Sequence, residues 1–137
     1  MDIRPFSEED RRQVVRLWKT VFADDPPHND PDAVVSAKLK VDELLFVAVE
    51  QGTLIGTVMA GYDGHRGWLY SVAVDPQRQG GGIGRQLVEH AVAALRGRGC
   101  IKVNLQVRSG NSAVVAFYRR LGFAVEDRVS MGLLIGE

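Results

Sequence analysis

The sequence predicts an α/β fold in which helices pack on one mixed β-sheet. Two observations predict it: strand-like segments alternate with segments of helical period, and a glycine run separates an apolar strand from a long amphipathic helix. The predicted elements are strand 3–6, helices 7–22 and 31–40, strands 44–49, 53–61 and 69–74, helix 83–95, strand 101–107, helix 112–121 and one or two strands within 123–135. This order, β-α-α-β-β-β-α-β-α-β(-β), is typical of a sheet with crossover helices packed on it.

The composition indicates an ordinary globular protein. A chain of 137 residues fits one domain, 1–137, and 45% hydrophobic with 25% charged residues is typical of a soluble fold. The 17 Lys and Arg residues balance the 17 Asp and Glu residues, whereas nucleic-acid binders usually carry a basic excess. We therefore expect no nucleic-acid partner.

Cysteine use and hydropathy indicate the compartment. The single cysteine, Cys100, excludes an internal disulfide and suits a reducing cytosol. No apolar run approaches the ~20 residues that span a bilayer. The N-terminus lacks the apolar segment of a signal peptide. We expect a cytoplasmic protein with no membrane partner.

Cap residues and apolar stripes predict the first two helices. Ser7 precedes three acidic residues, which suits a helix N-terminus, and Asp30 with Pro31 supplies an N-cap and a first-turn proline. The apolar positions are Val14, Leu17, Trp18, Val21 and Phe22 in the first helix and Ala33, Val34, Ala37, Leu39 and Val41 in the second. We ascribe Asp24, Asp25, His28 and Asp30 to loop and cap roles, and we expect no metal site. We expect His90, on helix 83–95, to face solvent.

Turn residues separate the strands. Gln51 and Gly52 join strands 44–49 and 53–61 as a hairpin, and the polar segment 62–67 leads into strand 69–74. Apolar residues alternate with polar ones through 101–107, which predicts a strand with one buried face. Helix 112–121 ends at Gly122, and the strand composition of 123–135 predicts two short strands turning near Asp127.

The glycine run has the form of an anion site. Asp75 and Pro76 end the preceding strand, and the glycines stand at 80, 81, 82 and 84, where a helix begins. Bare backbone N–H groups at a helix N-terminus bind phosphate groups. A P-loop is excluded because no Gly-Lys-Ser or Gly-Lys-Thr occurs, and a dinucleotide fingerprint fails because Leu87 takes the place of its third glycine.

Two motifs resemble those of the GCN5-related N-acetyltransferase (GNAT) family. Residues 79–84, Gln-Gly-Gly-Gly-Ile-Gly, match its acetyl-CoA signature, Q/R-x-x-G-x-G/A. Residues 111–123 resemble its N-x-x-A-x-x-L/F-Y-x-x-x-G-F motif, with Val114 in place of alanine. The motifs cover about half of the chain, and the segments 57–59 and 61–67 are similar to those of the small bacterial YpeA-type subgroup.

The resemblance implies a single GNAT-like domain with a splayed central sheet and with acetyl-CoA as the donor. The CoA diphosphate would lie on the backbone of residues 80–84, with side-chain contacts from Gln79 or Arg85. A distorted strand at 72–74 would pair with the pantetheine arm and polarise the acetyl carbonyl, and Asn111 would bond the pantetheine. The implied cofactor-binding residues are Val72, Ala73, Val74, Gln79, Gly80, Gly81, Gly82, Ile83, Gly84, Arg85, Asn111 and Tyr118.

The resemblance also implies the chemistry. Tyr118 would act as general acid to the leaving thiolate, and the attacking amine needs a base or a water chain to take its proton. One branch of the family, which acetylates ribosomal-protein N-termini, carries a glutamate in a Leu-Glu-Val-Arg context where this chain has Gln106. The base candidates that remain are Asp63, His65, Glu50 and solvent.

Several functional alternatives stay open. The expected activity is acetylation of a primary amine, of a small molecule or a peptide, by direct attack in a ternary complex. A non-catalytic acyl-CoA-binding or sensing module on the same fold is the alternative, and a nucleotide-binding α/β domain is a third. Loops 24–31 and 62–67 would select the acceptor, with Tyr62, Asp63, His65 and Arg66 as candidate contacts. A longer acyl donor and a homodimer, which is common in the family, also stay open.

Overall fold

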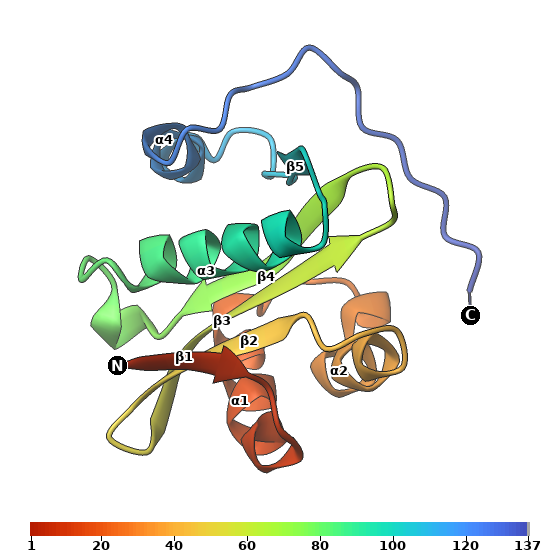
Figure 1. Ribbon diagram of the computed structural model, residues 1–137. Coiled ribbons are helices and arrows are strands. Elements are labelled where there is room, and N and C mark those ends of the chain that lie inside the picture. The colour runs from red at the N-terminus through yellow and green to blue at the C-terminus, as the bar shows by residue number, and fades with distance from the viewer. Residues whose placement is uncertain (137) are drawn as a thin grey trace. The chain divides into compact units, whose positions relative to one another are not determined.

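A computed structural model describes residues 1–136 of the chain. The chain forms two compact units, Met1–Leu105 and Gln106–Glu137, and each is described by itself. The first unit contains β1 (Asp2–Pro5), α1 (Arg11–Val21), α2 (Pro31–Leu39), β2 (Leu45–Glu50), β3 (Thr53–Tyr62), β4 (Gly67–Val74), α3 (Ile83–Gly97) and β5 (Val103–Asn104) (Figure 1). The second contains α4 (Ser112–Arg120).

The first unit is a five-stranded mixed sheet with helices on both faces. The strand order is β1-β2-β3-β4-β5, in which neighbours from β1 to β4 are antiparallel and β5 is parallel to β4. Helix α3, which links β4 to β5, lies along one face, and α1 and α2 lie on the other (Figure 1). This arrangement confirms the mixed α/β fold that the element order predicts.

Adjacent residues of β3 show how closely the helices pack on the two faces of the sheet. A Cβ atom on Gly56 would stand 2.8 Å from Leu87 Cδ1 of α3, so only glycine lets the helix come this close to the strand. The next residue, Thr57, receives a hydrogen bond from Trp18 of α1 on the opposite face. The core on that face comprises Val14, Leu17, Trp18, Val35, Leu45, Val47, Leu54, Met59 and Ala73.

Local sequence signals account for the element ends. The predicted hairpin is confirmed: Gln51 and Gly52 both take left-handed φ values, 51° and 78°, as the tight turn between β2 and β3 requires. Asp30 caps α2, because its Oδ2 accepts the N–H of Ala33 at 3.2 Å. Six apolar residues recur at helical spacing in α3; Val92 is half-buried, and the other five are buried, namely Ile83, Leu87, Val88, Ala91 and Leu95.

Three local predictions are wrong. The strand expected over 101–107 is only Val103–Asn104, the two residues that are in register with β4. Within the described chain, residues 123–136 form neither helix nor strand. Apolar alternation gives these segments strand propensity, but a strand forms only where a neighbouring edge supplies hydrogen bonds.

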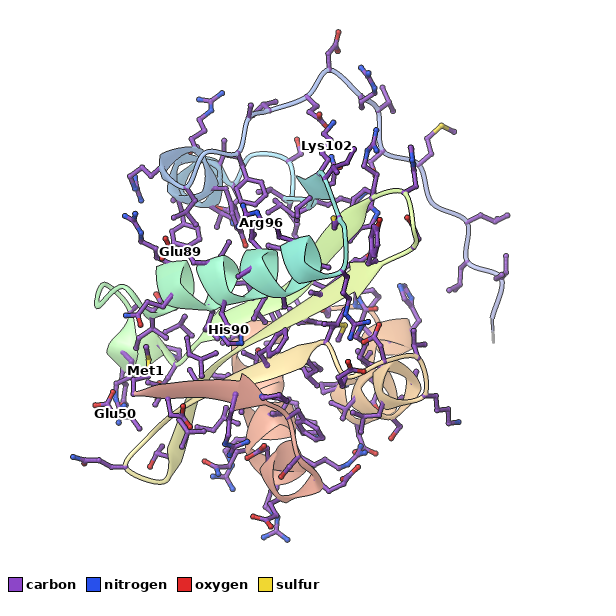
Figure 2. All side chains as sticks on the ribbon, in the orientation of Figure 1. Met1, Glu50, Glu89, His90, Arg96 and Lys102 are labelled. Carbon is purple, nitrogen blue, oxygen red and sulfur yellow. The ribbon has the colours of Figure 1, made fainter. Side chains whose placement is uncertain are left out.

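The third wrong prediction concerns a helix surface. His90 was expected to face solvent from α3, but its ring packs edge-on against Phe46 of β2, with 4.7 Å between the ring centroids. Figure 2 shows His90 on the side of α3 toward the sheet and Glu89 on the side away from it.

No helix within residues 1–136 is long and apolar enough to cross a membrane.

Candidate active site

Strand β4 loses its regular pairing midway along its length. Its parallel pairing with β5 covers only Gly67 with Val103 and Trp68 with Asn104. On its other side the register with β3 shifts between Thr57 and Met59. The sequence resemblance implied a splayed central sheet, and the two-residue pairing of β4 with β5 agrees with it.

The register shift is a β-bulge centred on Ser71. Thr57 pairs with Ala73 and Met59 with Tyr70, so Ser71 and Val72 together stand opposite one residue of β3. Ser71 has φ 50°, a left-handed conformation that non-glycine residues rarely adopt. The bulge lies directly before Ala73 and Val74, and it shares Val72 with the stretch 72–74 that was expected to pair with the pantetheine arm.

The glycine-rich turn lies between the end of β4 and the start of α3. The N–H of Asp75 donates to the carbonyl of Ile55 at 2.8 Å, and Asp75 Oδ1 accepts the N–H of Gln77 at 3.0 Å, which fixes the start of the turn. Gly80 and Gly82 then take φ values of 89° and 82°, and no other group lies within 4 Å of the position of a Cβ on either residue. The backbone of this turn is therefore accessible from outside.

The N-terminus of α3 follows at once. The first bond onto the helix runs from the N–H of Gln86 to the carbonyl of Gly82 at 3.1 Å, so the N–H groups of Ile83, Gly84 and Arg85 have no acceptor within the helix. Such groups carry the positive end of the helix dipole. The exposed turn and the free helix end fit a diphosphate.

Two side chains flank the turn. Gln79 Nε2 donates to the carbonyl of Val74 at 3.4 Å, which folds the amide back onto the end of β4. Arg85 lies 3.6 Å from Glu89, and both are well exposed, so the pair leaves the guanidinium available to an anion.

The residues expected to contact the amine acceptor lie in the turn between β3 and β4. Asp63 Oδ1 accepts the N–H groups of His65 and Arg66, both at 2.7 Å, and these bonds lower the pKa of Asp63. Arg66 donates to the carbonyl of His65 at 3.0 Å, and the Tyr62 hydroxyl donates to that of Gly64 at 3.4 Å. The segment is a hydrogen-bonded turn rather than a loose loop.

Glu50 lies at the opposite end of the hairpin ladder from this turn. It pairs with Thr53 at the start of β3, whereas Tyr62 ends that strand. Figure 2 shows Glu50 beside Met1. At about 3.3 Å per residue, the five residues from Thr53 to Val58, which faces the bulge, span roughly 17 Å. The structure therefore separates Glu50 from the other base candidates.

Tyr70 is a site candidate that the sequence did not single out. It directly precedes the bulge, is 50% exposed, and has a pKa raised by burial and by the charge of Asp63. Its register position opposite Met59 puts it on the face covered by α1 and α2. The sequence signal that could have identified Tyr70 is a tyrosine just before the strand segment that was expected to be distorted.

The second unit contains the other two motif residues. Asn111 is the N-cap of α4, and its Oδ1 accepts the N–H of Val114 at 3.3 Å. Tyr118 is 9% exposed, with Phe117 and Phe123 packed edge-on at centroid distances of 4.9 and 5.5 Å. Burial raises the pKa of Tyr118 to about 12, so the phenol stays protonated throughout the neutral range.

Within residues 1–136, no group of three or more His, Cys, Asp or Glu side chains is placed to hold a metal ion. Asp30 of the acidic loop acts as a helix cap. The buried Cys100 has its Sγ 3.3 Å from the carbonyl of Lys102, to which it donates. The polar groups of interest therefore remain those of β4, the glycine turn, the β3–β4 turn and α4.

Comparison with known proteins places this geometry in a family. Residues 9–123 match the model of the acetyltransferase (GNAT) family. A protein of Yersinia pestis (strain Pestoides F) named acetyltransferase is 39% identical over 133 residues, which cover 96% of this chain and 94% of that protein.

Solved structures share the fold. The aminoglycoside N-acetyltransferase AAC(6')-Iy, solved in complex with CoA, superposes with a TM-score of 0.82 at 21% identity, covering 98% of this chain and 95% of that one. The PaiA N-acetyltransferase of Thermoplasma acidophilum, also in complex with coenzyme A, gives 0.77 at 23% identity, covering 93% and 92%. The chain belongs to the acetyltransferase (GNAT) family and is an acyltransferase.

Proposed function

We propose that this protein is an acetyl-CoA-dependent N-acetyltransferase. It transfers the acetyl group to a primary amine of a small molecule or peptide by direct attack in a ternary complex. One observation carries the proposal: an exposed glycine turn and an open helix N-terminus follow directly on a bulged strand that has left its parallel neighbour.

The donor is held by two kinds of backbone group. The diphosphate takes the N–H groups of residues 80–84, where Gly80 and Gly82 have nothing within 4 Å of their Cβ positions, with Gln79 and Arg85 at its edge. The pantetheine arm runs along Val72, Ala73 and Val74, where β4 has no partner on the β5 side within the described chain. Asn111 retains two amide donors for the arm after its oxygen caps α4.

The chemistry is a direct acyl transfer. A neutral amine nitrogen attacks the thioester carbonyl carbon, a C–N bond forms, and the C–S bond breaks. The thiolate takes the proton of Tyr118, which burial keeps protonated at neutral pH. The amine proton passes to a base, and Tyr118 is reprotonated from solvent.

The structure narrows the choice of base. Asp63 is disfavoured because two backbone N–H groups stabilise its ionised form and lower its pKa. Glu50 ends β2, roughly 17 Å along the ladder from the residue that faces the bulge, and the turn that carries His65 lies about as far away in the other direction. We propose His65, Glu50 or a water molecule as the base, with Tyr62, Arg66 and Tyr70 as contacts of the amine acceptor.

The family relationship and two CoA-bound structures of the same fold support acetyl-CoA as cosubstrate. The acceptor, the acyl length and the homodimer remain expectations from the sequence, as does the cytoplasmic location. No observation on this chain favours the non-catalytic acyl-CoA module over the enzyme.

An acceptor panel tests the proposal. Amino acids, peptides, polyamines and aminoglycosides are incubated with acetyl-CoA and enzyme, and released thiol is measured. We expect acceptor-dependent thiol release with at least one amine. Binding of acetyl-CoA with no turnover across the panel would contradict the enzyme and favour the sensing module.

A further inference from the structure

A fully buried threonine connects helix α1 to the bulge of β4. The indole N–H of Trp18 donates to Thr57 Oγ1 at 2.8 Å, and the same hydroxyl donates to the carbonyl of Ser71 at 2.9 Å. Thr57 and Asp10 are the buried polar side chains of the described chain. A hydroxyl that accepts once and donates once in a dry core is fully satisfied and has one orientation.

This chain of bonds ends on the strained residue. Ser71 holds φ 50°, and neither it nor Val72 has a partner in the sheet register of residues 1–136. A left-handed non-glycine residue is strained and persists only where its surroundings fix it. The bond from Thr57 supplies that restraint in place of a ladder bond.

Fixing one carbonyl also fixes the next N–H. In a trans peptide the carbonyl of Ser71 and the N–H of Val72 lie in one plane and point in opposite directions, and the described chain has no cis peptide. With the Ser71 carbonyl held toward Thr57, the N–H of Val72 points away from it. That N–H belongs to the stretch proposed above to bind the acyl arm.

We propose that Trp18 and Thr57 are positioning residues for acetyl transfer, which hold the peptide between Ser71 and Val72 so that the Val72 N–H meets the thioester carbonyl. The inference rests on the proposed function. Neither side chain touches the substrate. Their effect is expected on kcat, because a donor aimed at a developing oxyanion acts in the transition state. The diphosphate contacts are untouched, so KM for acetyl-CoA stays the same.

Three variants separate the hydrogen bonds from packing. Thr57→Val keeps the shape and removes the hydroxyl, whereas Thr57→Ser keeps the hydroxyl and removes a methyl group. Removing one oxyanion donor costs about 10²- to 10³-fold in kcat, so misaiming one should cost about 10- to 100-fold. We expect that loss for Thr57→Val, with KM for acetyl-CoA within about twofold, and kcat within about threefold of wild type for Thr57→Ser.

Trp18→Phe is the third variant, and it keeps an aromatic ring and the bond from Thr57 to Ser71. We expect kcat to fall about three- to tenfold at unchanged KM, since the hydroxyl loses its orienting donor. If Thr57→Val shows no cooperative thermal transition, this variant decides. Thermal unfolding is followed for all three, with kinetics measured well below each midpoint.

The outcomes distinguish this inference from the proposed function. Wild-type protein that neither binds acetyl-CoA in calorimetry nor releases thiol overturns both. Wild-type turnover together with kcat within twofold for Thr57→Val overturns only the positioning role, as does an equal loss for Thr57→Val and Thr57→Ser. If Trp18→Phe is the deciding variant, an unchanged kcat has the same meaning.

Discussion

Tyr118 carries the proposed proton donor on a single hydroxyl. Tyr118→Phe removes that group and keeps the ring between Phe117 and Phe123. We expect kcat to fall about 10²- to 10⁴-fold, as for other general acids, while calorimetry shows an acetyl-CoA dissociation constant within about threefold of wild type. Equal losses in kcat and binding would assign Tyr118 to cofactor packing.

The same residue predicts a feature of the pH profile. Burial raises the pKa of Tyr118 to about 12, above the ~10 of a free phenol, so the protonated form is favoured by the fold and is lost only as pH rises through the higher value. The kcat of the wild type should therefore show no falling limb below about pH 10, provided the protein stays folded. A falling limb near pH 8 would mean that another group is the acid.

Asp63 provides a test of the base. Asp63→Asn keeps an Oδ1 acceptor for the N–H groups of His65 and Arg66 and removes the charge. Because the pKa of this carboxyl is already lowered, we expect kcat within about threefold of wild type. His65→Gln is the companion variant that separates histidine from solvent. A loss of a hundredfold or more for Asp63→Asn would identify Asp63 as the base.

At the scale of elements, the start of α3 depends on the left-handed backbone conformation of Gly82. Gly82 has φ 82°, so Gly82→Ala introduces strain of about 1 to 2 kcal/mol and adds a methyl group to an open backbone surface. We expect acetyl-CoA binding to weaken at least tenfold by calorimetry, because the diphosphate needs close approach to that backbone.

The control lies at the other end of the same helix. Gly99 has φ 89° and, like Gly82, nothing within 4 Å of its Cβ position. Gly99→Ala should lose similar stability in urea unfolding with acetyl-CoA affinity unchanged. If both variants weaken binding equally, the effect is general strain and the glycine turn does not hold the cofactor.

A hydrogen-bonded ion pair connects β1 to the start of α1. Arg4 donates to both carboxylate oxygens of Asp10, at 2.8 and 2.9 Å, and the N–H of Ser7 donates to Oδ2 at 2.8 Å. These bonds, that from Arg4 first, lower the pKa of the buried Asp10. The ionised carboxylate therefore stabilises the fold above the ordinary pKa of about 3.9, and the gain is lost as pH falls through the lower folded value.

Asp10→Asn should accordingly reduce the free energy of unfolding by about 1 to 3 kcal/mol at neutral pH, toward the low end because Arg4 is partly exposed. Urea titrations at pH 7 and below about pH 3 measure it, and the difference should shrink in acid. The exposed neighbour Glu9→Gln is the control. A difference that stays constant with pH would exclude the charge as its cause.

The sequence predicted elements well where the signal is local and less well where it depends on a partner. Asp30 and Gly52 act through their own backbone neighbourhood, so α2 and the β2–β3 turn were predicted. The length of β5 depends on how far β4 runs beside it, which the alternation of 101–107 does not encode. The family resemblance implied a distorted strand at 72–74, but not the left-handed conformation of Ser71 just before it, which no local sequence pattern indicates.

For the molecule as a whole, the two family motifs predicted most candidate site residues because the glycines and Tyr118 are recognisable as sequence. Tyr70 and the pair of Trp18 and Thr57 were missed for a physical reason. Trp18 and Thr57 are 39 residues apart in the sequence, and each alone is typical of a residue in a helix core or a strand. Only the fold shows that they share a hydrogen bond that ends at the bulge.

Calorimetric titration of the wild-type protein with acetyl-CoA, and separately with NAD and ATP, tests the central claim most directly. Saturable binding of acetyl-CoA, competed by free CoA and absent or much weaker for NAD and ATP, is the result expected of a glycine turn that holds the CoA diphosphate ahead of α3. Binding of NAD or ATP with no binding of acetyl-CoA would contradict it.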